Sequence, residues 1–448
     1  MAEPKNLSLP GPVETALSLL EAGGYEAYVV GGCTRDSLLG TVPDEWDITT
    51  SALPEQTLEV FRDYRTIETG LQHGTVTVRI DKTNLEITTY RVDGKYEDSR
   101  HPDAVTFTRS LSEDLARRDF TMNAIAYSPT RGWKDLYGGA EDIEDHLIRC
   151  VGDPETRFTE DALRVLRALR FSSVLGFEIE GKTANAIHAL KHRINFVAYE
   201  RIAVELLKLL CGKNVYRVLQ DYRDVFAVIL PEMEPCFDFE QHNPWHIYDV
   251  YTHIAKSVEA VRPEPELRLA MLLHDIGKPE TFFLDEKGIG HFYGHPAVSA
   301  RMADSIALRL RLSNAMKKEV TTLVEFHDSP LEPDRKMLRR RLNKFGKTTL
   351  WNLLEVNRAD LSAQNPEKAG PQLDKLRTIE ETLELLLREN PAFKVADLEV
   401  DGEDLIALGM HPGPEVGKLL KEILEKVMAE ELPNDRFRLL DYIAGKVL

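Results

Sequence analysis

The chain has 448 residues, of which 43% are hydrophobic and 29% are charged, and its formal net charge is −18. This length allows about two to four domains with sizeable cores. The acidic balance excludes indiscriminate binding of nucleic acid through overall charge, although local basic patches can still hold a nucleic-acid substrate.

The four cysteines lie far apart and include no CxxC pair. This spacing predicts a reducing compartment, without a disulfide framework or a four-thiolate zinc site. The N-terminal stretch MAEPKNLSLPGP has no apolar signal segment, and no apolar run is long enough to span a membrane. We therefore expect a cytoplasmic protein that does not bind a membrane.

The first part of the chain mixes helical and strand patterns. Apolar residues at helical spacing predict helices at residues 13–22 and 54–62. A short apolar run predicts a buried strand at residues 26–31, alternating β-branched runs predict strands at 74–80 and 84–92, and residues 105–107 return to strand character. The second and third of these form a hairpin, and the polar stretch at 93–102 is expected to be a loop.

Helical periodicity dominates the rest of the chain. The expected helices of the next part are 113–126, 159–175, 183–192, 199–210 and 214–224. The proline-rich stretch 231–244 interrupts the pattern and is a candidate domain boundary. Residues 246–330 are helical and rich in histidine, and 332–448 are helical with alternating acidic and basic blocks.

Glycines and carboxylates meet in the stretch from Gly31 to Asp47. Gly31 and Gly32 stand between a strand and a helix, where a glycine pair lets backbone N–H groups approach a phosphate. Glu45 and Asp47, two residues apart, are expected on one face of a strand, where they can share a divalent metal. Glu86 can supply a third carboxylate if its strand lies alongside. Together these features favour nucleotidyl transfer.

The octapeptide RRDFTMNA, residues 117–124, offers two arginines beside an aspartate. Arginine presents a rigid fork of donors that suits a triphosphate, and Asp119 can accept from a ribose hydroxyl. The pattern therefore suits nucleotide binding. An exposed, ion-paired helix start is the alternative interpretation of the same eight residues.

One aspartate and three arginines recur every three residues in the expected helix 159–175. They are Asp161, Arg164, Arg167 and Arg170. At this spacing consecutive members lie near one another on a helix. An aspartate accepts from the exocyclic amine of cytosine or adenine, and an arginine donates to the ring nitrogen. Uracil and guanine present a carbonyl where the aspartate needs a donor. The row predicts selection of CTP and ATP, with a solvated basic face as the alternative.

Histidines gather in the second half of the chain. Seven of the 13 fall between residues 242 and 327. Among them, His274 is followed by Asp275 at the end of an apolar helical run, and Asp360 downstream can add a carboxylate. Adjacent His and Asp at a helix end, with histidines on other helices, are how a helical bundle builds a metal site.

Four motifs in this order resemble the class II tRNA nucleotidyltransferases, which are the CCA-adding enzymes and their bacterial poly(A) polymerase relatives. They are GGCTRD (31–36), WDITT (46–50), RRDFTMNA (117–124) and EDALRVLRALRF (160–171). The resemblance covers residues 25–210 and implies an α+β fold, in which a polymerase-β-like nucleotidyltransferase head with a small mixed sheet precedes a helical neck, body and tail. Residues 246–360 resemble an HD phosphohydrolase domain.

These resemblances imply a domain plan and its partners. The expected domains are a catalytic head (1–150), a nucleotide-selecting neck (151–230), an HD-type metal-binding domain (240–365) and an RNA-binding tail (366–448). The implied partners are tRNA, ATP and CTP. RNA would contact a basic run, or this run is a solvated helix face: Arg335, Lys336, Arg339, Arg340, Arg341, Lys344 and Lys347.

The same resemblances assign roles to single residues. The implied catalytic carboxylates are Glu45 and Asp47, as Mg²⁺ ligands, and Glu86 on the expected neighbouring strand is the candidate for a third catalytic carboxylate. The implied nucleotide-binding residues are Gly31, Gly32, Arg35, Asp36, Arg118, Asp119, Asn123, Asp161, Arg164, Arg167 and Arg170. The HD pattern implies a second divalent metal at His253, His274, Asp275 and Asp360, with a further ion at His295 and His327.

One departure from the family pattern concerns the metal ligands. The family usually has Asp-x-Asp, whereas this chain has Glu45-Trp46-Asp47 preceded by Asp44. We favour Glu45 as the ligand, because Asp44 should point to the other face of the strand. In this family the loop at 93–102 is associated with adding the terminal A, and its presence favours full CCA or A addition over CC addition alone.

Several other functions are compatible with the sequence. Within the family, the chain is alternatively an A-adding enzyme or a poly(A) polymerase. Outside it, the alternatives are a metal-dependent phosphohydrolase with a degenerate head, or an RNA-binding protein that incorporates no nucleotide.

Overall fold

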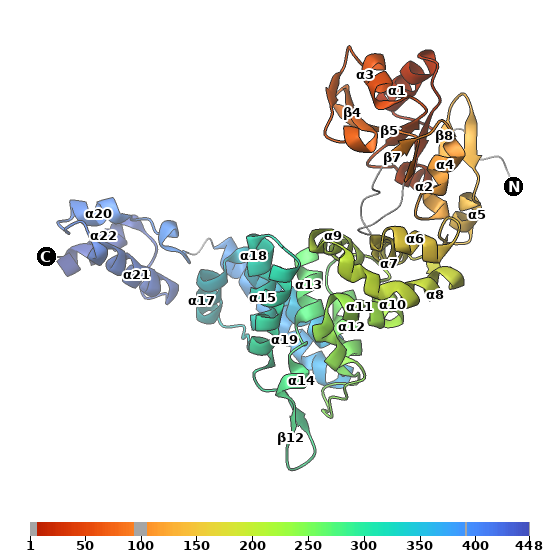
Figure 1. The fold of residues 1–448 in the computed structure, drawn as a ribbon. Helices are drawn as coiled ribbons and strands as arrows, with labels where there is room; N and C mark the ends of the chain where they lie inside the picture. The colour runs from red at the N-terminus through yellow and green to blue at the C-terminus, as the bar shows by residue number, and fades with distance from the viewer. Residues whose placement is uncertain (1–6, 94–104, 390–391, 448) are drawn as a thin grey trace. The chain divides into compact units, whose positions relative to one another are not determined.

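The structure is a computed structural model that describes residues 7–93, 105–389 and 392–447 (Figure 1). The chain divides into two compact units, Met1–Pro231 and Glu232–Leu448. In the part of the chain that the structure describes, no helix is long and apolar enough to cross a membrane.

A seven-stranded mixed sheet forms the centre of the first unit, in the order β3-β4-β5-β2-β1-β8-β9. Its strands are β1 (Ala27–Val30), β2 (Asp47–Thr50), β3 (Arg65–Ile67), β4 (Thr75–Ile80), β5 (Thr83–Thr89), β8 (Ile125–Ser128) and β9 (Gly132–Asp135). Strands β2 and β5 run parallel, and the other neighbours run antiparallel. The predicted α+β class with a mixed sheet is confirmed.

Short helices and strands surround this sheet. They are α1 (Gly11–Ala22), α2 (Gly32–Leu38), α3 (Pro54–Val60), α4 (Leu111–Ala116), α5 (Gly139–Glu144), the 3₁₀ turns η1 (Leu71–His73) and η2 (Thr121–Asn123), and the strand pair β6 (Arg91–Asp93) and β7 (Val105–Phe107). One core joins α1 to the sheet, with Val13, Leu17 and Leu20 of the helix packed among Val76, Val78 and other strand residues.

The first unit ends in a helical part. Its elements are β10 (Leu147–Ile148), α6 (Pro154–Glu160), α7 (Leu163–Leu175), β11 (Glu178–Ile179), α8 (Gly181–Leu190), η3 (Lys191–Phe196), α9 (Tyr199–Leu210), α10 (Val215–Asp221) and α11 (Arg223–Ile229). Helix α7 packs against α9 and α10, which places its arginines beside the residues that precede β8.

The second unit is almost entirely helical. Its elements are η4 (Pro231–Cys236), α12 (Val250–Ala260), α13 (Pro265–Leu273), α14 (Lys278–Thr281), β12 (Phe283–Leu284), β13 (Gly290–His291), α15 (His295–Arg309), α16 (Asn314–Phe326), α17 (Arg335–Phe345), α18 (Lys347–Ser362), α19 (Pro366–Arg388), η5 (Val395–Asp397), α20 (Gly402–Ala407), α21 (Pro414–Met428) and α22 (Arg436–Val447). Helices α12, α13, α16 and α18 contact one another and carry most of the histidine cluster.

Two predicted helices differ from the structure. The helix expected over 113–126 ends at Ala116, and Ile125–Ser128 instead forms β8 next to β1. All four residues of β8 are buried, and periodicity alone does not separate a fully buried strand from a buried helix. The helix expected over 159–175 is split between α6 and α7, because Asp161 has extended backbone (φ −138°, ψ 102°). Residues 94–102 of the predicted loop lie outside the described residues.

Candidate functional site

Two carboxylates face each other across the only parallel strand pair of the described seven-stranded sheet. Asp47, the first residue of β2, is the register partner of Glu86 in β5, so both side chains lie on one face. The neighbouring protein desolvates Asp47 and raises its pKa; Arg118 opposes this, and Glu86 and Glu45 raise it further. The edge of the sheet therefore concentrates negative charge, as a site for a divalent cation does.

Glu45 was expected on a strand with Asp47, but the structure places it before the strand begins. It precedes β2 and lies in an exposed loop, so the sheet does not hold its carboxylate. Trp46 packs against the core of the unit, and the residues on either side of it, Glu45 and Asp47, are exposed. Among the described residues, the convergent groups of three or more metal ligands all lie in the second unit, so Glu45, Asp47 and Glu86 do not converge equally closely.

Gly31 lies directly beside Asp47. It precedes α2 with φ +91°, a conformation that side-chain-bearing residues rarely adopt. A Cβ built on Gly31 would lie 3.3 Å from Nη1 of Arg118 and 3.7 Å from Oδ2 of Asp47. Glycine at this position thus leaves space that a side chain would fill, between an arginine and a carboxylate.

A chain of hydrogen bonds joins α2, η2 and α7 next to this space. Arg35 Nη1 donates to Asn123 Oδ1 (2.8 Å), and Asn123 Nδ2 donates to Asp119 Oδ1 (3.1 Å). Arg167 Nε donates to Asp119 Oδ2 at 2.8 Å. Burial raises the pKa of Asp119, but Arg167 and the hydrogen bond from Asn123 lower it to about 2. The carboxylate therefore stays charged and orients its two donors.

Three guanidinium groups surround the ring of Phe171 in α7. Those of Arg35, Arg167 and Arg170 lie 4.9, 5.5 and 4.0 Å from the ring centroid. Arg35 also pairs with Asp36 at 2.7 Å, and Arg170 pairs with Glu205 of α9 at 2.6 Å. The ring and the two carboxylates hold the arginines at fixed positions, which is the arrangement that anion binding needs.

The predicted row of acid and bases along one helix is wrong at its first member. Asp161 lies before α7, where its carboxylate accepts from the Leu163 amide (3.0 Å) and pairs with Arg201 of α9 (2.9 Å). Arg164 instead pairs with Glu160 at 2.8 Å and donates to the backbone oxygen of Arg117. Sequence reasoning missed Arg201 and Glu205. They lie four residues apart on α9, in a stretch that matches no recognised motif.

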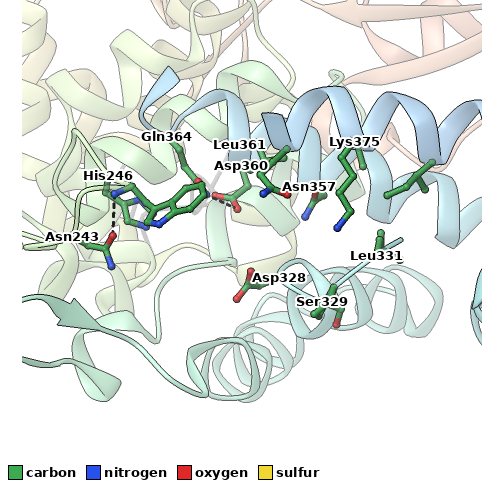
Figure 2. Close-up of a pocket in the computed structure, with 15 residues that line it drawn as sticks. Asn243, His246, Asp328, Ser329, Leu331, Asn357, Asp360, Leu361, Gln364 and Lys375 are labelled. Carbon is green, nitrogen blue, oxygen red and sulfur yellow. Dashed lines mark hydrogen bonds between the residues drawn. The ribbon is translucent and has the colours of Figure 1, made fainter. Parts of the chain in front are cut away.

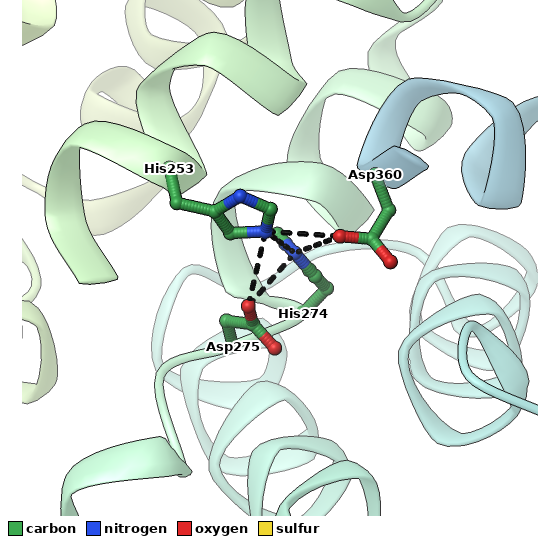
Figure 3. Close-up of side chains that lie close together, drawn as sticks. All are labelled: His253, His274, Asp275 and Asp360. Atoms are coloured by element: carbon green, nitrogen blue, oxygen red, sulfur yellow. Dashed lines mark hydrogen bonds and ion pairs between the residues drawn. The ribbon is translucent and has the colours of Figure 1, made fainter. Parts of the chain in front are cut away.

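Four residues from three helices and their ends converge in the second unit (Figure 3). Nε2 of His253 lies 3.2 Å from Nε2 of His274 and 2.9 Å from Oδ1 of Asp360. Oδ2 of Asp275 lies 3.2 Å from the same two nitrogens. All four side chains are buried. The structure thus brings together the four residues of the predicted metal site.

A second group adjoins the first through the same aspartate. Oδ1 of Asp275 lies 3.1 Å from Nε2 of His295 and 3.6 Å from Nε2 of His327. Lys278 Nζ pairs with Oδ2 at 2.6 Å, yet both oxygens are buried without a hydrogen bond among the described residues. One carboxylate oxygen toward each pair of histidines is the arrangement of a bridging ligand between two metals.

Backbone carbonyls determine which nitrogen each histidine offers. Nδ1 lies 2.7 Å from the Met271 oxygen in His274, 2.9 Å from the Phe292 oxygen in His295 and 2.7 Å from the Val324 oxygen in His327. His253 Nδ1 lies 3.2 Å from the Ala363 oxygen. Because a carbonyl only accepts, each Nδ1 carries a proton, so Nε2 is the nitrogen whose lone pair a metal can use once it displaces a second proton. Lone pairs and carboxylates that face one another fit divalent metal ions.

Two cavities open beside these ligands. One, of about 260 Å³, is lined by Asp275, His295, His327, Lys278 and Tyr293, among others. The other, of about 400 Å³, is lined by Asp360, Gln364, Lys375 and neighbouring residues (Figure 2). The histidine centre is therefore buried at its ligands but reachable by a small molecule.

Comparisons with known proteins agree with this geometry. Residues 27–149 match the family model "Poly A polymerase head domain", and 176–237 match "Probable RNA and SrmB- binding site of polymerase A". A tRNA nucleotidyltransferase domain 2 model matches residues 297–443. The CCA-adding enzyme of Lactobacillus helveticus is 36% identical over 93% of this chain and 92% of that enzyme. The chain belongs to the CCA-adding enzyme family.

Other members of the family extend the likeness over the whole chain. The CCA-adding enzyme of Leuconostoc mesenteroides is 36% identical over 94% of this chain and 92% of its own length. The CCA-adding enzyme of Bacillus stearothermophilus, solved in complex with CTP, superposes with a TM-score of 0.72. That structure is 29% identical and covers 98% of both chains. The predicted family and nucleotidyltransferase class are confirmed.

Proposed function

We propose that this chain adds the CCA sequence to the 3′ ends of tRNA from CTP and ATP, without a template. The observation that supports this most is the position of Asp47, opposite Glu86 and beside Gly31 and Arg118, in a member of the CCA-adding enzyme family. The four predicted domains and the cytoplasmic location are part of this proposal.

In the head, acidic side chains bind the cation, and arginines and backbone N–H groups bind the triphosphate. Asp47 and Glu86 provide oxygen ligands for a divalent ion, proposed to be Mg²⁺, and Glu45 joins them by moving its loop. When bound, the ion lowers the pKa of the RNA 3′-hydroxyl and neutralises the leaving pyrophosphate. The Gly31–Gly32 backbone and Arg118 hold the triphosphate, and Arg35 and Asp36 support α2 beside it.

Selection between nucleotides falls to α7. Asp161 and Arg164 already have protein partners, so a base edge replaces Arg201 and Glu160 when it binds. Cytosine and adenine offer an amine donor to Asp161 and an unprotonated ring nitrogen to Arg164, whereas uracil and guanine present a carbonyl oxygen beside a protonated ring nitrogen. Asp119 and Asn123 fix Arg167 and Arg35 by hydrogen bonds, and Arg170 is fixed by Glu205.

Part of the predicted basic run serves the fold. Arg335 pairs with Glu389, and Arg339 is buried and pairs with Glu430, so both arginines attach α17 to later segments. We propose that the exposed members of the run contact tRNA: Lys336, Arg340, Lys344 and Lys347.

The test uses three tRNA transcripts, ending before CCA, after the first C and after CC. CTP, ATP, both together, UTP and GTP are supplied in turn with Mg²⁺. We expect two C and then one A, with no U or G. A single A on the CC-ended transcript alone would instead make this an A-adding enzyme, and long A tails on any RNA would make it a poly(A) polymerase.

The ligand set has its own test in this assay. Glu45→Asp restores the Asp-x-Asp pattern of the family and should keep incorporation, whereas Glu45→Gln should lose it. Asp44→Asn is the matched control, because it removes a charge from the same loop. Loss of incorporation in Asp44→Asn but not in Glu45→Gln would reassign the ligand.

We infer a second activity, metal-dependent phosphoester hydrolysis, at the histidine centre. It is favoured by the two convergent groups that share Asp275 and by the four Nε2 lone pairs that face them. Isothermal titration with Mn²⁺ should show binding that His274→Ala abolishes, together with phosphatase or cyclic phosphodiesterase activity. A chain that binds no metal there would contradict this second function.

A further inference from the structure

An aromatic cluster projects from the second unit beside the histidine centre. The β12–β13 hairpin and the residues that follow it bring together the rings of Phe283, His291 and Tyr293. His291 stacks on Phe283 and on Tyr293, with both centroid distances 5.3 Å and interplanar angles of 28° and 21°. In Figure 1 the hairpin, labelled β12, extends away from the helices of its unit.

This cluster is rigid and exposed at the same time. Asp285 Oδ2 lies 3.0 Å from His291 Nε2, and Asp285 Oδ1 accepts from the backbone amides of Lys287 and Ile289. These bonds fix the hairpin turn and the imidazole. Phe283 is nevertheless 45% exposed and Tyr293 is 74% exposed. A fixed aromatic face open to solvent suits the stacking of a planar group.

The cluster borders the cavity that contains the proposed metal ligands. His291 and Tyr293 line the 260 Å³ cavity together with Asp275 and His295. Chain continuity explains this, because Tyr293 and Gly294 directly precede His295, the first residue of α15. A ligand held by the histidine centre is therefore next to the aromatic face.

The cavity continues on the other side of the ligands. The 400 Å³ cavity shares Asn243, His246, Asp328, Asp360 and Gln364 with the smaller one. Beyond this shared part it is lined by Trp245, Leu361, Leu376 and Ile379, with Lys375 as a cation. The histidine centre thus has room on two sides, which suits a phosphorus atom that carries two ester substituents.

We propose that the histidine centre takes a nucleotide phosphodiester, with one base stacked on Tyr293 and the second substituent in the cavity lined by Trp245. This rests on the second activity inferred above. In the reaction, a water oxygen bonds to phosphorus and one P–O ester bond breaks. The leaving oxygen takes up the proton that water releases, so that a phosphomonoester and an alcohol are formed.

The experiment measures stacking directly. The probe is a dinucleoside phosphorothioate with 2-aminopurine as one base, added to the full-length protein with Zn²⁺, and its fluorescence is quenched when the base stacks. We expect Tyr293→Leu to weaken binding about tenfold, because base–aromatic stacking has that size. Tyr293→Phe should bind like the unaltered chain, since it keeps the ring. Trp245→Leu should weaken binding without removing the quenching.

Phe437→Leu is the matched control, because Phe437 on α22 is 76% exposed and lies in none of the cavities described above. Equal affinity of Tyr293→Leu and the unaltered chain would overturn the proposal, as would equal affinity for 2-aminopurine ribonucleoside monophosphate. Titration of the protein with Zn²⁺ distinguishes failure of this proposal from failure of the second activity on which it rests. Zn²⁺ bound without any effect of Tyr293 removes only this inference, and a chain that binds neither Zn²⁺ nor Mn²⁺ at the histidine centre removes the second activity with it.

Discussion

The head and the histidine centre hold their carboxylates in opposite ways. In the head, Asp47 and Glu86 reach solvent from strands, and Glu45 lies in a loop. In the second unit, Asp275 is 1% exposed and four histidines, each fixed through Nδ1 by a backbone carbonyl, surround it. The head is an open site that a bound nucleotide has to complete, whereas the histidine centre is assembled by the fold itself.

This difference follows from where the ligands lie on their elements. His274 and His327 directly follow the last residues of α13 and α16, where the final carbonyls of a helix have no partner within it. Each imidazole satisfies a carbonyl of its own helix and so acquires a fixed orientation. The strands of the head satisfy their backbone groups within the sheet and leave the acidic side chains free. The strand carboxylates thus stay open to solvent, whereas the two imidazoles at helix ends are held by their own helices.

Reciprocal loss of activity is the largest expected effect. Asp47→Asn should lower nucleotide incorporation about 1000-fold, because a metal ligand contributes several kcal/mol to the transition state. His274→Asn should leave incorporation unchanged and abolish metal-dependent phosphoester hydrolysis. Both rates are measured on the same full-length preparations. Loss of both activities in either variant would mean that the two sites do not work independently.

A buried ion pair in the head gives the next effect. Asp119→Asn should destabilise the first unit by about 3 kcal/mol, because it removes the buried charge that pairs with Arg167 at 2.6 Å and leaves only the longer contact with Glu205 at 3.8 Å. Since the folded pKa of Asp119 is about 2 and the unfolded value is about 3.9, the contribution is complete above pH 4. It is lost as pH falls through 2.

Urea unfolding of both chains at several pH values tests this. The difference in unfolding free energy between the unaltered chain and Asp119→Asn should be constant from pH 8 to about pH 4 and shrink below it. The double variant Asp119→Asn with Arg167→Met should recover part of the loss. A difference that grows on acidification would contradict the low pKa.

Removal of bound metal should lower the stability of the second unit and leave that of the first unit unchanged. A metal at 100 times its dissociation constant stabilises the folded state by about 2.7 kcal/mol. We expect a chelator to lower the unfolding temperature of the second unit and to leave that of the first unaltered. Differential scanning calorimetry with and without chelator measures this, and His274→Ala is the control that should not respond. If the chelator lowered the unfolding temperature of the first unit alone, the fold-assembled metal site would have to lie in the head and not at the histidine centre.

Sequence patterns predicted the residues of the histidine centre more completely than those of the head. The residues of the histidine centre were predictable, because His274-Asp275 and the neighbouring histidines are rare residue types in a dense group. The orienting carbonyls of Met271, Phe292 and Val324 were not, since every residue has a carbonyl and only the fold selects these. In the head, the motifs identified Asp47 and Gly31, but the partner of Asp161 is Arg201, which lies 40 residues away on another helix.

The fold was predictable where local pattern and tertiary structure agree. The hairpin of β4 and β5 follows from its alternating residues, and Asp81 and Lys82, with φ of 47° and 72°, form its turn. Strand β8 was not predictable, because Ile125–Ser128 follows a helix and is buried on all sides. Its place beside β1 is decided by the sheet, and a single apolar run contains no information about its neighbours.

The smallest effect concerns the crowding of charge at the sheet edge. Desolvation raises the pKa of Asp47, with Glu86 and Glu45 contributing. A carboxyl whose folded pKa is raised makes the folded state less stable at every pH above the unfolded pKa. Glu86→Gln removes one of the charges, so we expect the Asp47 pKa to fall and the unfolding free energy at pH 7 to rise slightly. At pH 3, where Asp47 is protonated, the two chains should be equally stable.

Carboxyl ¹³C titration of Asp47 and unfolding curves at the two pH values measure both quantities. A more stable Glu86→Gln that incorporates nucleotides more slowly would mean that the head keeps a strained cluster of charge for its cation. In the histidine centre the sign is opposite: desolvation raises the pKa of the buried Asp275, but its interactions with the cations of His274 and Lys278 outweigh this and lower the pKa well below its usual range. Asp275→Asn should therefore be less stable at pH 7. If Glu86→Gln and Asp275→Asn changed the unfolding free energy in the same direction, electrostatics would not distinguish the open site of the head from the histidine centre.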